Sequence, residues 1–320
     1  MTHSKRFINF AILSVLLAAS APLYALDLVK IGVPAATYAP LAPVYMAQEL
    51  GYYKDAGVQV EITAYRGGAM AQQMIAAGEA DMIYHFPTGV ALAVKKGIKE
   101  KIVGAAGLTA GGWHLVVVKD SPIKSLADIA GKKVGVTAKG SSTDFFAMWA
   151  ARKAGVEIQT IPLGFGAMIP ALKGGQLDAC VLAPPLSQQM FVTGEGRSIA
   201  DFSKDVGISL PELWVASQAT IDQRPKAVEG VLKAIYRATR YMQLPQNRAY
   251  TLKFLKQHTR ESNDKVNELV FEAAITKLAT QATIKPEWLK AAMALAVGTG
   301  VENMRPEEFV TDKFFNVQAD

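Results

Sequence analysis

The stretch VGVTAKGSSTDFFAMWA, residues 134–150, sets the frame for interpreting the whole chain. An apolar run, Val134–Thr137, is followed by small and polar residues and then by the helix-compatible run Phe145–Ala154. This order predicts a strand, a tight turn and the start of a helix. The first turn of a helix leaves backbone N–H groups unpaired and suits a small anion, although a plain helix cap fits the same pattern. The candidate ligand residues of this turn are Gly140, Ser141, Ser142 and Thr143.

The chain carries two copies of one α/β pattern. Residues 28–86 alternate strand-like and helix-like runs, which is typical of a largely parallel sheet. VKIGV at 29–33 is matched by KKVGV at 132–136, and IAAGEADM at 75–82 is matched by LKGGQLDA at 172–179. The offset between the copies stays between 97 and 103 residues. This repetition predicts two similar α/β lobes.

Two apolar runs, Leu115–Lys119 and Leu213–Ser217, bracket the second copy and predict two crossings between the lobes. The predicted division assigns residues 26–118 and 217–320 to lobe one and residues 119–216 to lobe two. From residue 221 onward the spacing of apolar residues is helical. We expect these C-terminal helices to pack on lobe one.

Composition is that of an ordinary globular protein. Of 320 residues, 50% are hydrophobic and 19% are charged, with a net charge of +6. The positive charge is scattered, without a basic stripe interleaved with aromatic residues, so nucleic acid is not an expected partner. The sequence has no phosphate-binding loop, zinc-binding helix motif or nucleophile elbow. Asp81 and Asp178 occupy equivalent places in the two copies and are expected to fix turns. We therefore expect no catalytic residues, no metal and no cofactor.

The N-terminus predicts export. Lys5 and Arg6 precede the apolar run Phe7–Ala19, and small residues follow to Ala25, which is typical of a secretory signal peptide over residues 1–25. The run is shorter than the roughly 20 residues that a membrane-spanning helix needs. The single cysteine, Cys180, excludes an intramolecular disulfide, and no cysteine ends the signal to carry a lipid. The sequence predicts a free protein in the periplasm.

Ligands of open parallel sheets lie beyond the carboxyl ends of the strands, so the loops there predict a cleft between the lobes. Aromatic rings would bury the body of a ligand, and small residues would bring backbone N–H groups to its charged end. The aromatic candidates are Tyr38, Phe86, Trp113, Phe165 and Trp214. Gly67 and Gly68 are further small candidates. His114, like His85, is either a donor to the ligand or a buried core histidine.

Three motifs carry a family resemblance: AQELGYYKDAGV at 47–58, GEAD at 78–81 and SLADIAGKKVGVTAKG at 125–140. They resemble the substrate-binding proteins of ABC importers for nitrate, taurine, aliphatic sulfonates and thiamine-precursor pyrimidines, over nearly all of residues 27–300. The resemblance implies a type II periplasmic-binding-protein fold with two hinge strands. It also implies that the protein delivers its solute to ABC permease subunits in the inner membrane, with a separate chain acting as the ATPase. We expect a binding protein and no enzyme. We expect a monomer.

The predicted solute is a small organic anion, with a sulfonate first and an aromatic carboxylate second. The aromatic candidates favour an organic ligand over nitrate, and residues 141–143 favour an anionic end. Arg66 is the single arginine of the predicted cleft loops, which argues against a dicarboxylate. A thiamine-precursor pyrimidine or a related heterocycle is the alternative. The fungal pyrimidine synthases resemble the chain in outline and are enzymes, but they carry a cysteine-rich stretch that this sequence lacks. A periplasmic sensor subunit would use the same cleft.

Overall fold

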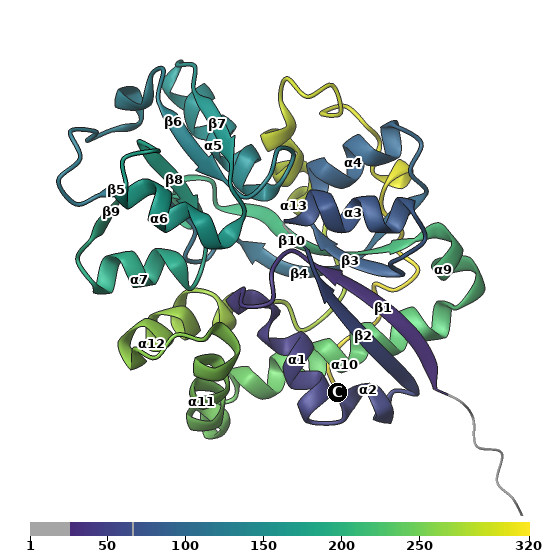
Figure 1. Cartoon of the computed structure of the whole chain (residues 1–320). Coiled ribbons are helices and arrows are strands. Elements are labelled where there is room, and N and C mark those ends of the chain that lie inside the picture. The colour runs from purple at the N-terminus through teal and green to yellow at the C-terminus, as the bar shows by residue number, and fades with distance from the viewer. Residues whose placement is uncertain (1–25, 66) are drawn as a thin grey trace, which may run out of the picture.

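The computed structural model describes residues 26–65 and 67–320. The expected signal peptide, residues 1–25, and Arg66 lie outside the described residues. The described chain folds into two α/β lobes, each built on a five-stranded sheet (Figure 1). Within these residues, no helix has the length and apolar character that crossing a membrane requires.

The sheet of lobe one combines parallel and antiparallel pairs. Its strand order is β2-β1-β3-β10-β4. The bounds are β1 (Asp27–Val33), β2 (Val58–Ala64), β3 (Met82–His85), β4 (Glu100–Thr109) and β10 (Ile208–Ser217). β1 pairs in parallel with β2 and β3, whereas β10 runs antiparallel to β3 and β4. The parallel strands are joined by helices, which are α1 (Ala42–Glu49), α2 (Tyr52–Asp55) and α3 (Gly68–Ala76), and α4 (Pro87–Lys95) leads from β3 to β4.

The sheet of lobe two repeats this order as β7-β6-β8-β5-β9. The strands are β5 (His114–Val118), β6 (Lys133–Val136), β7 (Gln159–Pro162), β8 (Ala179–Leu182) and β9 (Gly196–Asp201). The helices are α5 (Ser142–Ala154), α6 (Met168–Lys173), α7 (Leu186–Val192) and α8 (Phe202–Asp205). β6 pairs in parallel with β7 and β8, as β1 does with β2 and β3. The prediction of two similar α/β lobes is confirmed.

The two copies also share a side-chain device. The Lys30 backbone N–H donates to Asp81 Oδ2 at 2.9 Å in lobe one. The Lys133 backbone N–H donates to Asp178 Oδ2 at 2.8 Å in lobe two. Each carboxylate ties the loop before β3 or β8 to the neighbouring parallel strand, which is the structural role expected of this aspartate pair.

Both predicted crossing runs lie inside sheets. Leu115, Val116 and Val117 of β5 are fully buried between β8 and β9, and Val215 and Ala216 of β10 are fully buried between β3 and β4. Uninterrupted apolar runs of this kind suit strands covered on both faces. The chain passes between the lobes at residues 110–113 and again at residues 206–207. By strand pairing, residues 114–118 go with lobe two and residues 208–216 with lobe one, which shifts the expected division at 118/119 and 216/217.

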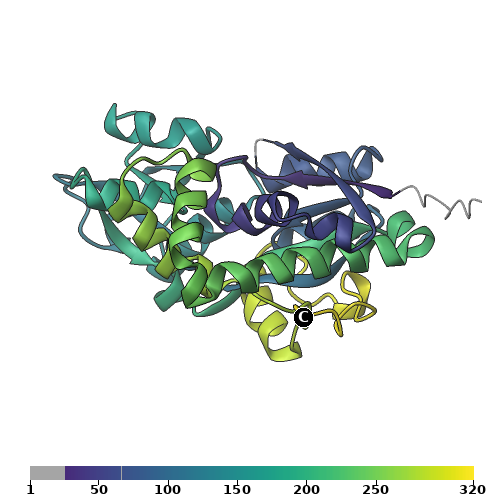
Figure 2. The same cartoon turned by 90° about the horizontal axis from the view of Figure 1, so that it is seen from below.

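The C-terminal helices cover lobe one, as expected. They are α9 (Gln218–Gln223), α10 (Pro225–Gln243), α11 (Arg248–Thr259), α12 (Asp264–Ala273) and α13 (Pro286–Met293). α10 packs on α1 and α2, and α13 packs on β10 and α4. α12 in addition contacts α7 of lobe two, so the helices beneath the molecule reach both lobes (Figure 2).

Candidate functional site

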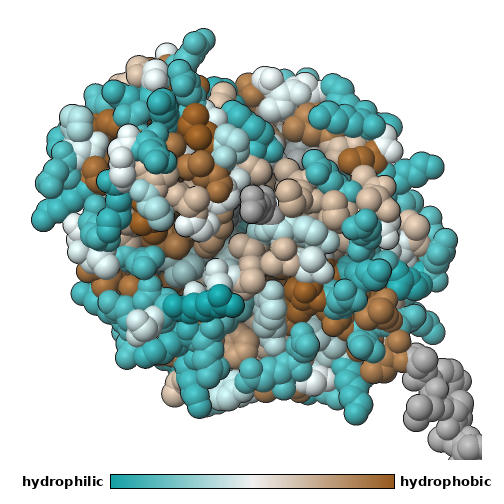
Figure 3. Space-filling view, in the orientation of Figure 1, coloured by the Kyte–Doolittle hydropathy of each residue, from teal (hydrophilic) through white to brown (hydrophobic). Residues whose placement is uncertain are grey.

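A cavity lies between the lobes at the carboxyl ends of β1, β3, β6 and β8. It contains about 480 Å³ of empty space that is partly open to solvent. The space in which the centre of a water-sized sphere fits is about 40 Å³, so the two lobes stand close together around the cavity. On the face shown in Figure 3, the outer surface is mainly hydrophilic, and apolar side chains gather near the junction of the lobes.

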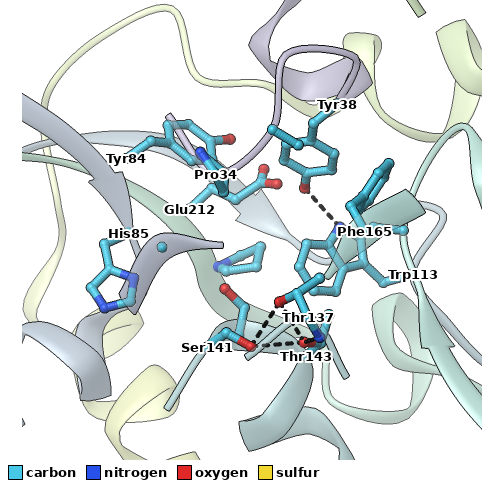
Figure 4. A pocket seen from close by; sticks show the side chains of 15 residues that line it. Pro34, Tyr38, Tyr84, His85, Trp113, Thr137, Ser141, Thr143, Phe165 and Glu212 are labelled. Carbon is cyan, nitrogen blue, oxygen red and sulfur yellow. Dashed lines mark hydrogen bonds between the residues drawn. The ribbon is translucent and has the colours of Figure 1, made fainter. Parts of the chain in front are cut away.

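Glu212 is the acidic group of the lobe one wall. Its side chain is 4% exposed, and its Oε1 atom has no hydrogen-bond partner among the described residues. Burial raises the pKa of this carboxyl well above its ordinary value. Leu210, two residues earlier, has φ of 43°, a strained conformation for a leucine, and Pro211 after it also lines the cavity. The backbone thus departs from a regular strand just before Glu212, whose side chain lies beside Pro34 and Tyr84 in Figure 4.

His85 occupies a slot between two glycines. A Cβ on Gly68 would lie 2.4 Å from His85 Nδ1, and a Cβ on Gly89 would lie 2.3 Å from Nε2. Both ring nitrogens lack a hydrogen-bond partner in the described part of the chain, and the side chain is 3% exposed. Burial lowers the His85 pKa to about 4, so the imidazole is neutral at pH 7. Because the two glycines cover its nitrogens, the neutral imidazole packs beside the cavity.

Three hydroxyl groups form the wall of lobe two. Thr137 Oγ1 lies 2.9 Å from both Ser141 Oγ and Thr143 Oγ1, and the latter two lie 2.8 Å apart (Figure 4). Ser141 Oγ donates to the Ala138 carbonyl oxygen at 2.7 Å. Ser141 is also the N-cap residue of α5, and its side chain makes no capping hydrogen bond to the helix. The first-turn N–H groups of α5 therefore have no hydroxyl cap, and Ser142 and Thr143 line the cavity.

Three aromatic rings close a further side of the cavity. Trp113 Nε1 donates to the Tyr38 hydroxyl oxygen at 3.1 Å. Tyr38 meets Trp113 and Phe165 edge to face, with ring centroids 6.1 and 5.9 Å apart. Tyr38 belongs to lobe one and Phe165 to lobe two, so this wall is assembled from both lobes (Figure 4). Such a wall can bury a flat apolar body.

The cavity brings together most of the predicted ligand residues. Those that line it are Tyr38, Gly68, Trp113, Ser141, Ser142, Thr143 and Phe165. Gly67 and Gly140 are neighbours of lining residues. A Cβ on Gly67 would lie 3.4 Å from Thr137 Oγ1, and the Gly140 N–H donates to Asp144 Oδ2 at 2.9 Å.

Three predicted residues lie elsewhere, and their placement corrects the sequence-based expectation. Phe86 is fully buried and stacks on Phe145, with ring centroids 5.4 Å apart. Trp214 is 2% exposed and packs behind Tyr84. His114 lines a separate opening, and its Nδ1 lies 3.0 Å from Ser198 Oγ. In each case core packing or a local hydrogen bond, and not the cavity, accounts for the side chain.

Sequence reasoning missed Glu212, Tyr84 and Thr137. Glu212 directly precedes the apolar run Leu213–Ser217, which contains Trp214, and the prediction named the aromatic residue instead. A charged residue inside an otherwise apolar strand was the available signal, because such a residue is rarely buried without a reason. Within residues 26–65 and 67–320 no group of three His, Cys, Asp or Glu side chains is arranged to hold a metal ion.

Comparison with known proteins gives one family and a consistent fold. The model of the family described as NMT1/THI5 like matches residues 39–249, more than half of the chain. A protein of Brucella abortus, provisionally named a binding protein, is 26% identical over 286 residues, covering 85% of this chain and 87% of that protein. A protein of Haemophilus influenzae, provisionally named a thiamine biosynthesis protein, is 26% identical over 248 residues, covering 75% of this chain and 76% of its own.

Among solved structures, the alkanesulfonate-binding protein SsuA of Xanthomonas axonopodis pv. citri, bound to MOPS, superposes with a TM-score of 0.75. It is 18% identical, and the alignment covers 89% of this chain and 97% of SsuA. A likeness at this identity establishes the fold, which is the type II periplasmic-binding-protein fold that the sequence predicts.

Proposed function

We propose a solute-binding function on one premise: the chain belongs to the NMT1/THI5 like family. The protein captures a small molecule between its lobes and delivers it, as a periplasmic monomer, to the permease subunits of an ABC importer. The cavity walled by both lobes supports capture, and the export pattern of residues 1–25 supports the location. The relative from Brucella abortus, provisionally named a binding protein, supports binding over catalysis.

Glu212 is the observation that defines the ligand. The lining residues that the structure describes include no lysine or arginine, and His85 is neutral at pH 7. A buried carboxyl with an unpartnered oxygen needs a donor, because an unsatisfied buried polar group costs roughly 1–3 kcal/mol. An amino group beside a ring nitrogen supplies such a donor. We therefore place an aminopyrimidine or related heterocycle ahead of a sulfonate, which reverses the order favoured by the sequence alone.

A small organic anion is the second candidate, and α5 is the observation that favours it. The helix points its first turn at the cavity, and its N-cap side chain leaves the first-turn N–H groups uncapped. Helix N-termini favour negative charge. The three hydroxyls beside it are already bonded to one another or to the Ala138 carbonyl, so they would have to rotate to donate to an anion.

A thermal-shift panel tests both candidates. The panel contains a hydroxymethyl-aminopyrimidine, taurine, an alkanesulfonate, benzoate and nitrate. A ligand present at about 100 times its dissociation constant stabilises the folded protein by roughly 2.7 kcal/mol. We expect a shift with the pyrimidine. A shift with sulfonates alone would overturn the proposed order, and no shift with any compound would contradict the proposed ligand classes.

Glu212→Gln is the matched variant. It keeps the size of the side chain and removes the acidic group, so we expect aminopyrimidine affinity to fall about tenfold, the usual cost of losing a buried hydrogen bond. Affinity for any bound sulfonate should stay level or rise. Isothermal titration measures both, and unchanged pyrimidine affinity would show that Glu212 does not contact the ligand.

A further inference from the structure

The first turns of helix α5 both line the cavity and contact lobe one. Ser142 and Thr143 in its first turn line the cavity, and Phe145, two residues further, points out of lobe two into lobe one. There its ring lies on Phe86, at a centroid distance of 5.4 Å and an interplanar angle of 27°. Phe86 is fully buried and Phe145 is 6% exposed. The two rings form a contact between the lobes, hereafter the interlobe stack.

The interlobe stack is adjacent in sequence to both walls of the cavity. Phe86 directly follows His85, which lines the cavity from lobe one. Phe145 follows Thr143 by two residues, and Thr143 lines the cavity from lobe two. A shift of one ring against the other would therefore move a residue of one wall against a residue of the other.

Besides the neighbouring Phe146 ring, whose centroid lies 6.0 Å from that of Phe86, a polar contact joins α5 to lobe one. Arg152 Nη2 donates to the carbonyl oxygen of Leu295 at 2.8 Å, and Leu295 lies in the short helical segment after α13. This bond is partly exposed to solvent, whereas both rings of the interlobe stack are buried. Buried aromatic pairs contribute through area and through ring geometry, so the stack is the stronger of the two contacts.

We infer that Phe145 and Phe86 are positioning residues for solute capture: their stack sets how closely the lobes approach and so holds the first turn of α5 against the ligand. This inference rests on the proposed solute-binding function. The rings touch no ligand. They stabilise the closed form that holds a bound solute, so the solute dissociates more slowly.

The test compares Phe145→Ala and Phe145→Leu with Trp149→Leu. Trp149 is one turn further along α5 and packs on Phe202 within lobe two, so its loss controls for damage to the helix itself. Stopped-flow fluorescence with the hydroxymethyl-aminopyrimidine gives the two rate constants. We expect Phe145→Ala to raise the dissociation rate about tenfold at an unchanged association rate, and Phe145→Leu to raise it about threefold. Trp149→Leu should leave both rates within about twofold of wild type.

Small-angle X-ray scattering without any solute is the second readout. We expect a larger radius of gyration for Phe145→Ala than for wild type or Trp149→Leu. Equal radii, or equal dissociation rates in Phe145→Ala and wild type, would overturn the inference. If the pyrimidine fails to bind wild type, the proposed ligand fails while scattering still decides whether the stack holds the lobes together. If Phe145→Ala does not fold, Phe145→Leu carries both measurements.

Discussion

Lobe one and lobe two share a strand order and an aspartate that ties two strands together, yet they bring different chemistry to the cavity. Lobe one contributes a buried carboxyl and a buried imidazole, Glu212 and His85. Lobe two contributes three small hydroxyls and the start of α5. The repeated parts of the chain build the frame, and the parts that differ between the copies determine what the frame can bind.

The largest expected difference between the lobes concerns the shared aspartate. Asp81 accepts from the Lys30 N–H, accepts from Thr220 Oγ1 at 3.1 Å and pairs with Arg224, so it also joins α9 and the start of α10 to lobe one. Asp178 accepts the equivalent bond from the Lys133 N–H and, among the described residues, has no counterpart of the Thr220 and Arg224 contacts. We expect Asp81→Ala to cost about 3 kcal/mol of unfolding free energy and Asp178→Ala about 1 kcal/mol. Urea unfolding measures both, and equal losses would show that the C-terminal contacts add nothing.

The next difference is in pH dependence. Among the described residues the buried carboxyls are Glu100 and Glu212, both in lobe one. Burial raises the pKa of Glu100 from 4.5 to about 7, against the opposing hydrogen bond from Gln72. A raised folded-state pKa means that stability is full below about pH 4.5 and is lost as pH rises through about 7.

Glu100→Gln should remove this loss, because the amide can still accept the Gln72 bond without ionising. We expect the variant to be more stable than wild type by about 2 kcal/mol at pH 8 and equal to it near pH 4.5. Denaturant titrations at the two pH values provide the measurement. A gain that is the same at both would point to packing and not to ionisation.

The smallest expected difference separates two equivalent glycines. A Cβ on Gly68 would lie 2.4 Å from His85 Nδ1, whereas a Cβ on Gly166, its counterpart in lobe two, meets nothing within 4 Å. Gly68→Ala should cost about 1.5 kcal/mol and disturb the cavity, while Gly166→Ala should stay within about 0.5 kcal/mol of wild type. Thermal unfolding of both variants tests the pair. If Gly68→Ala is neutral, the imidazole slot is not rigid.

The sequence carried enough information to predict the architecture, because repeated motifs at a near-constant offset mark equivalent elements. It also placed the Ser141–Thr143 turn beside the cavity, because the loop that follows a parallel strand lies at the carboxyl edge of the sheet. It could not separate Phe86 and Trp214 from Trp113, because an aromatic ring near a strand end can serve core or cavity equally well. The position of Glu212 depends on a local irregularity, because the pairing of β10 with β4 shifts register between Glu212 and Leu213. No pattern in the sequence predicts this shift.

The single cysteine has a practical consequence for optical measurement. Cys180 is fully buried in β8, and burial raises the pKa of its thiol to about 12, so it reacts poorly with maleimide dyes at neutral pH. A cysteine introduced on the exposed surface of each lobe could then carry a donor and an acceptor dye with little background labelling. The native chain is thus already suited to conversion into a fluorescent biosensor, with no cysteine to remove first.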